Sequence, residues 1–292
     1  MSHRTTLAFF SGVGTGLALV GAAGVGVRRF VVQRNAAASA LNKLLPVHSA
    51  WWRARFDKQG ELLYVALGDS TAQGIGATNP GRSYVGRLAG RMRSATHGSV
   101  RVVNLSVSGA TTWLCRKDQL PKLEKVDREP DVVTVGIGAN DIIDFEPERF
   151  ERNLRHIYSA LPSHAIVGDV PAMFLPDREK KIAVANQIVR RVADERGLTV
   201  APVYDTTRAQ GFFRTWRNSA GDLFHPNDRG YRVWASAFEP AVLARVARIA
   251  ADRAGDTASA QESLVAHATA RTAEHVAGRA SAATTPDPRP VA

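Results

Sequence analysis

The sequence predicts an α/β fold, a three-layer α/β/α sandwich in which helices cover both faces of a five-stranded parallel sheet. Short apolar runs rich in β-branched residues alternate with longer helical patterns, and this alternation repeats along the body of the chain. Strands that are separated by helices form parallel sheets, and right-handed crossovers place those helices on both faces. The apolar fraction of 45% and the charged fraction of 22% are typical of a soluble globular domain.

The elements follow one another in a regular order. The expected strands are 62–67, 100–105, 132–137, 165–168 and 198–203. The expected helices are 84–95, 147–160, 177–195 and 226–251. In the third of these, apolar residues from Ile182 to Val192 recur every three or four positions, and Gly197 ends the pattern.

An uncharged segment, residues 5–27, precedes this body. It is flanked by Arg4 on one side and by Arg28 and Arg29 on the other, and it is long enough to span a bilayer. The two arginines occupy the position where a signal peptide needs small residues, so an uncleaved membrane anchor is predicted. The alternative is a flexible amphiphilic leader. The larger positive flank after the span favours a cytoplasmic body.

The sequence divides into four parts. Residues 1–34 form the anchor or leader, and residues 35–60 form a connector whose amphipathic pattern predicts a short helix, either at the membrane surface or against the domain. Residues 61–252 form the domain. Residues 253–292 form an Ala/Thr/Pro-rich tail with little large apolar surface, which predicts disorder with some helix near 260–276.

Charge and cysteine content exclude several classes of function. The formal charge is +11, but the arginines are scattered and no basic block with interleaved aromatic residues occurs, so nucleic acid is not an expected partner. Cys115 is the single cysteine, so it cannot form an intrachain disulfide and makes a poor metal site. We expect neither a metal nor a cofactor, and the sequence leaves the oligomeric state open.

Candidate reactive residues follow the strands, because functional groups in an open parallel sheet lie beyond the carboxyl ends of its strands. Ser70 follows the first strand, Gly109 the second and Asn140 the third, and Asp222 lies three residues before His225 after the last strand. Each of these residues alone has an ordinary structural explanation. Together they supply a nucleophile, an N–H donor, an amide donor and an acid–base pair, which are the groups that acyl transfer requires.

These four segments resemble those of the SGNH (GDSL-like) hydrolase family, over roughly residues 62–237. The segment that begins at His225 and ends at Tyr231, HPNDRGY, is similar to the family's last block. Thr71 stands where many members have leucine after the serine. The resemblance implies a flavodoxin-like fold and the hydrolysis of lipid or carbohydrate esters without a metal.

The resemblance also implies a role for each residue. Ser70 is the expected nucleophile, and Asp222 and His225 complete a catalytic triad. The N–H groups of Ser70 and Gly109 and the side chain of Asn140 form the expected oxyanion hole. Two alternatives stay open: an acyltransferase that uses a sugar or lipid hydroxyl as acceptor, and a noncatalytic binding version of the fold.

Overall fold

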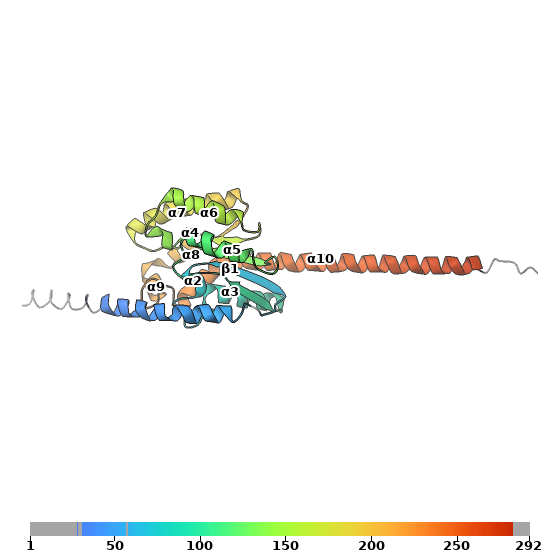
Figure 1. The fold of residues 1–292 in the computed structure, drawn as a ribbon, viewed down its shortest axis with the longest axis horizontal. Coiled ribbons are helices and arrows are strands. Elements are labelled where there is room, and N and C mark those ends of the chain that lie inside the picture. The colour runs from blue at the N-terminus through green and yellow to red at the C-terminus, as the bar shows by residue number, and fades with distance from the viewer. Residues whose placement is uncertain (1–27, 29–30, 57, 283–292) are drawn as a thin grey trace, which may run out of the picture. The chain divides into compact units, whose positions relative to one another are not determined.

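The computed structural model describes residue 28, residues 31–56 and residues 58–282, with side chains described as far as residue 255. The chain divides into two compact units, Met1–Arg245 and Val246–Ala292. The first unit contains the whole sheet and all of the predicted reactive residues (Figure 1).

The sheet has five strands, all parallel, in the order β2-β1-β3-β4-β5. The strands are β1 (Leu62–Gly68), β2 (Val100–Asn104), β3 (Val132–Gly136), β4 (Ile166–Gly168) and β5 (Thr199–Ala201). Every residue of β1 is buried, which explains why its sequence is an unbroken apolar run rather than an alternating one. The predicted five-stranded parallel sheet is therefore confirmed.

Helices and helical turns connect the strands. They are α2 (Ser70–Gln73), η1 (Pro80–Arg82), α3 (Tyr84–Thr96), α4 (Thr112–Leu114), the π-helical η2 (Cys115–Gln119), α5 (Leu120–Leu123), η3 (Asn140–Ile142), α6 (Pro147–Ser159), α7 (Pro176–Glu195), α8 (Val203–Arg208), α9 (Gly211–Arg217) and α10 (Asp228–Ala282). Helices α3, α6 and α7 begin and end close to the predicted positions, whereas α10 begins close to its predicted start and continues past residue 251. The short ones were not predicted, because a helix of one or two turns has too few residues to show a period.

Two helical layers enclose the sheet, with α6 and α7 on one face and α3 on the other (Figure 1). The first face packs against apolar side chains of α6 and α7 such as Leu154 and Val189, both fully buried. On the second face the ring of Tyr84 in α3 stacks on Trp234 and Phe238 in the first turns of α10. The three-layer arrangement is thus confirmed.

A helix over residues 31–53 precedes the sheet and packs on the domain. Trp52 is 4% exposed, and its indole Nε1 donates to the carbonyl of Gln73 at 3.0 Å. His48 is also buried and lies 3.3 Å from the same carbonyl. Of the two positions predicted for the connector, the one against the domain is observed.

The predicted anchor, residues 5–27, lies outside the described residues. Among the residues that the structure does describe, no helix has both the length and the apolar character that a bilayer crossing requires.

The C-terminal part differs from the prediction of a disordered tail. Helix α10 continues to Ala282, well beyond residue 253. The composition of this segment lacks large apolar side chains, but alanine has the highest intrinsic helix propensity and forms helix without a packing partner more readily than other residues do. A segment without large apolar side chains can therefore still be helical.

Candidate active site

Ser70 occupies the turn between β1 and α2. Asp69 caps this short helix: its Oδ1 accepts hydrogen bonds from the N–H of Thr71 at 2.8 Å and from the Thr71 hydroxyl at 2.7 Å. Gly68 has a φ of +155°, and a Cβ there would lie 2.5 Å from the carbonyl oxygen of Gly136 in the neighbouring strand. Glycine is therefore needed for the sharp bend that presents the serine.

Ser70, His225 and Asp222 form one hydrogen-bonded chain. His225 Nε2 lies 2.9 Å from Ser70 Oγ, and His225 Nδ1 lies 2.6 Å from Asp222 Oδ2. With the ring proton on Nδ1, the imidazole donates to the carboxylate and accepts from the serine hydroxyl. The structure thus brings Ser70 together with an acid–base pair, Asp222 and His225, that lies more than 150 positions further along the sequence.

Asp222 is held in its ionised form. Its Oδ1 accepts from the N–H groups of Phe224 and His225, each at 3.1 Å. Burial alone would raise the pKa of Asp222, but the hydrogen bonds from the His225 ring and from these N–H groups outweigh it and lower the pKa. A carboxylate that remains ionised can orient the imidazole and stabilise its protonated form.

The predicted amide donor lies at the end of β3, in η3. Asn140 Nδ2 donates to the carbonyl of Ala110 at 3.0 Å and lies 3.4 Å from Asp69 Oδ2. These contacts place the amide next to the Ser70 turn and orient its N–H bonds. The N-cap of η3 is Ala139, and the side-chain hydrogen bonds of Asn140 go to Asp69 and Ala110 rather than to the N–H groups of this helical turn.

Gly109 lies in the loop after β2 with a φ of +75°, and a Cβ there would meet no atom within 4 Å. Its backbone N–H donates no hydrogen bond to any group in the described part of the chain, and neither does the N–H of Ser70. Both donors are therefore free for an incoming oxygen atom. The positive φ explains why this position suits glycine.

Two supporting residues were missed by the sequence reasoning. Gln119 is fully buried, its Oε1 accepts from Gly68 N–H at 2.9 Å, and its Nε2 donates to Gly68 O at 2.8 Å. Asp141 accepts from the N–H and hydroxyl of Thr112 at 2.9 and 2.6 Å, which joins the loop of Asn140 to the loop of Gly109. Asp141 directly follows Asn140 in the segment after the third strand, but neither contact could be predicted from the sequence, because each joins distant segments.

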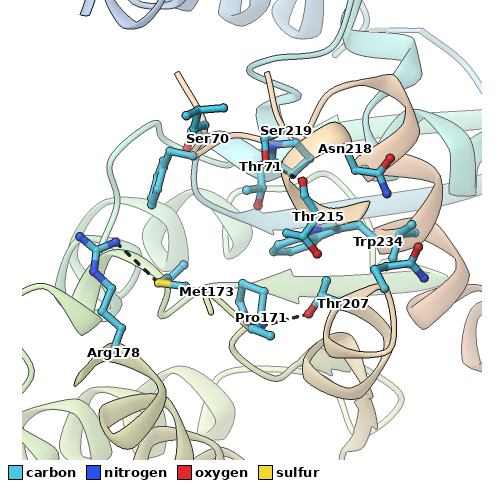
Figure 2. Close-up of a pocket in the computed structure, with 18 of the residues that line it drawn as sticks. Ser70, Thr71, Pro171, Met173, Arg178, Thr207, Thr215, Asn218, Ser219 and Trp234 are labelled. Atoms are coloured by element: carbon cyan, nitrogen blue, oxygen red, sulfur yellow. Dashed lines mark hydrogen bonds between the residues drawn. The ribbon is translucent and has the colours of Figure 1, made fainter. Parts of the chain in front are cut away.

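A cavity of about 160 Å³ opens beside Ser70 (Figure 2). Its walls include the apolar side chains of Pro171, Met173, Leu223 and Trp234. Polar groups occupy the side formed by α9 and the residue that follows it, where Figure 2 shows Thr215 and Asn218. The cavity can therefore hold an apolar acyl group and a polar group at the same time.

Other candidates for chemistry are weaker. No cluster of three or more potential metal-ligating side chains occurs within the described residues. Cys115 is buried, and burial raises the pKa of its thiol to about 12, so it is not a thiolate at neutral pH.

A comparison with known protein families gives one match. The model of the GDSL-like Lipase/Acylhydrolase family matches residues 66–233, a segment that contains Ser70, Gly109, Asn140, Asp222 and His225. No protein with a curated description matches the chain.

Several solved structures share the fold. An alpha/beta hydrolase enzyme from the metagenome of Lake Arreo, Spain, is 23% identical and superposes with a TM-score of 0.50 over 64% of this chain and 97% of that chain. The lipase/acylhydrolase from Enterococcus faecalis is 24% identical, with a TM-score of 0.51 over 63% and 96%. TesA is 20% identical, with a TM-score of 0.51 over 62% and 97%. The family match itself covers more than half of the residues, so this chain belongs to the GDSL-like lipase/acylhydrolase family and is an ester-hydrolysing enzyme.

Proposed function

We propose that the enzyme hydrolyses carboxylic esters of lipid or carbohydrate alcohols with Ser70 as nucleophile. The observation that carries the proposal is the chain of contacts from Asp222 through His225 to Ser70, with 2.6 and 2.9 Å between the bonded atoms, at the wall of a cavity. This arrangement supplies an activated nucleophile, a base and an orienting carboxylate.

The proposed reaction has two steps. His225 Nε2 takes the hydroxyl proton as Ser70 Oγ adds to the ester carbonyl, and it then gives that proton to the departing alcohol. A water molecule next adds to the acyl-serine, with His225 again as base, and the acid is released. Asp222 stabilises the imidazolium that forms in each step.

The oxyanion hole in this proposal has three donors. The N–H groups of Ser70 and Gly109 and the side-chain amide of Asn140 stabilise the negative oxygen of each tetrahedral intermediate. Two observations support this oxyanion hole. Both N–H groups lack a partner within the described residues, and the Asn140 amide lies next to the Ser70 turn. Fixed donors of this kind stabilise the transition state without reorganisation.

The test uses the Ser70→Ala variant. It should fold normally, should no longer hydrolyse a short p-nitrophenyl ester, and should not react with a fluorophosphonate probe. The matched control is Ser94→Ala, which removes an exposed serine hydroxyl of α3 and should behave as wild type. A Ser70→Ala protein that keeps wild-type hydrolysis or labelling would exclude Ser70 as the nucleophile.

We also propose that the enzyme works at a membrane, anchored by the uncharged residues 5–27. The support is the length of that span and its flanking arginines, whose distribution favours a catalytic domain on the cytoplasmic side. Lipid esters would then be within reach of the cavity.

A further inference from the structure

Four arginines line a second hollow, of about 320 Å³, beside the cavity of Ser70. Arg214 and Arg217 come from α9, and Arg229 and Arg232 come from the first turns of α10. In each pair the residues are three positions apart, so both side chains lie on one face of their helix. We call this feature the arginine hollow.

The positive charge of the arginine hollow is uncompensated. Within the described residues, none of the four guanidinium groups forms an ion pair or a side-chain hydrogen bond. The carboxylate of Asp228, which precedes Arg229 in the chain, is already bound by the Thr78 N–H, the Thr78 hydroxyl and Arg82. Like charges that are held together without counter-charge repel one another, and an anionic ligand relieves that repulsion.

The two helices that carry the arginines are locked together. Asn227 N–H donates to the carbonyl of Asn218 at 2.8 Å, and Asn227 Nδ2 donates to the carbonyl of Arg217 at 2.9 Å. Gly230 allows close approach of the helices, because a Cβ there would lie 2.4 Å from the Asn218 oxygen. The arginines are thus gathered before any ligand binds, and preorganisation of this kind favours affinity.

The hollow and the cavity are neighbours that share walls. Gln210, Asn218 and Val233 line both. Figure 2 shows Asn218 on the side of the cavity away from Arg178, and Ser70 lines the same cavity. Because these three residues line both, a substrate bound in the cavity lies beside the arginine hollow.

The chemistry of the lining identifies the anion. Guanidinium groups bind phosphate oxygens through paired hydrogen bonds, and several arginines around one hollow suit a group that carries two charges and at least three acceptor oxygens. We infer that the arginine hollow binds the phosphate group of the substrate, and that the preferred substrates are acyl esters of phosphorylated alcohols. This inference rests on the proposed function of Ser70.

The test compares two soluble substrates, the butanoyl ester of glycerol phosphate and the butanoyl ester of glycerol, on the full-length enzyme. The wild type should have a kcat/KM on the order of a hundredfold higher for the phosphorylated ester, because hydrogen bonds to charged groups are strong. The double variant Arg217→Gln/Arg229→Gln should lose most of this preference and keep its rate on the neutral ester. The control Arg93→Gln/Arg152→Gln, which changes two exposed arginines of α3 and α6, should keep the preference.

Each other outcome overturns the inference in a recognisable way. Equal kcat/KM values on the two esters, or an equal loss of the preference in the control variant, would show that the arginine hollow does not bind the phosphate group. If only esters embedded in phosphatidylglycerol vesicles are affected, the arginines attract a lipid surface instead. If inorganic phosphate changes the rate on the neutral ester without competing with the phosphorylated one, the hollow is an effector site. If neither ester is cleaved and a fluorophosphonate does not label Ser70, the proposed function has failed as well.

Discussion

In the proposed mechanism, the side-chain amide of Asn140 separates this site from serine hydrolases whose oxyanion hole consists of backbone N–H groups alone. It is oriented by the Ala110 carbonyl at 3.0 Å, and the carboxylate of Asp69 lies 3.4 Å away. Because the amide lies beside this carboxylate, the effect of replacing Asn140 depends on the charge of the new side chain.

Asn140→Ala should lower kcat by on the order of a hundredfold or more, with KM little changed, because the amide stabilises charge that develops in the transition state. Asn140→Asp should be at least as damaging, since it places an anion beside Asp69 and beside the forming oxyanion. Steady-state kinetics on a p-nitrophenyl ester, with circular dichroism to confirm folding, measure both effects. Near-wild-type turnover of the aspartate variant would remove Asn140 from the active site.

At the scale of elements, Gln119 connects the π-helical segment η2 to the end of β1. Its side-chain amide forms hydrogen bonds with both the N–H and the carbonyl of Gly68, two residues before Ser70. The Gly68 carbonyl has a second partner, because it also accepts from Val107 N–H at 3.2 Å. The N–H of Gly68 donates to Gln119 Oε1, so it is the group that loses its partner when Gln119 is changed. The bend that presents Ser70 is thus supported from a helix that lies elsewhere in the sequence.

Gln119→Leu should destabilise the protein by about 1 to 3 kcal/mol, because it leaves the Gly68 N–H buried without a partner. Urea unfolding followed by circular dichroism gives this difference. The matched control is Gln210→Leu, which changes a glutamine that the structure does not bury and should shift the midpoint little. An unchanged midpoint for Gln119→Leu would show that the Gly68 N–H is satisfied in another way.

Asp228 at the start of α10 binds the segment around η1. Burial alone would raise its pKa, but the hydrogen bonds from Thr78 and Arg82 outweigh it and lower the pKa below the ordinary value of 3.8. A carboxylate whose pKa is lower in the folded protein than in the unfolded chain stabilises the folded state when the pH is above the pKa of the unfolded chain. This stabilisation is lost as the pH falls through the pKa of the folded protein.

Asp228→Asn should therefore lower the free energy of unfolding by about 1 kcal/mol at pH near neutral, in line with the loss of charged hydrogen bonds. The difference from wild type should shrink as the pH falls below 3.8. Chemical denaturation over a series of pH values measures both proteins. A difference that is independent of pH would mean that the charge of Asp228 has no part in the contact.

For the whole molecule, the proposed anchor predicts where the enzyme is found. The full-length protein should sediment with membranes and resist carbonate extraction, because residues 5–27 are uncharged over the length of a bilayer span. A variant without residues 1–30 retains the helix over residues 31–53, which packs on the domain through Trp52, and it should be soluble and active. Full-length protein in the soluble fraction, or a mature N-terminus after Val27, would exclude an uncleaved anchor.

Much of the fold was predictable because its signals are local. The five strands are short apolar runs, and the long helices α3, α6 and α7 have clear periodicity and limits. The order of strands and helices then restricts the topology to a parallel sheet with right-handed crossovers. The tail has more helix than predicted: helix was expected only near residues 260–276, whereas α10 continues to Ala282, in line with the high helix propensity of alanine.

The sequence by itself determined the α/β class, the positions of the strands and the residue types that follow each strand end, including Ser70, Asn140 and His225. Only the tertiary structure decided that Gln119 supports the serine turn, that Asp141 joins two loops, and that arginines of α9 and α10 share one hollow. The physical reason is the range of the interactions: strand and helix patterns repeat within a few residues, whereas these contacts join segments whose proximity exists only after the sheet has brought its loops together.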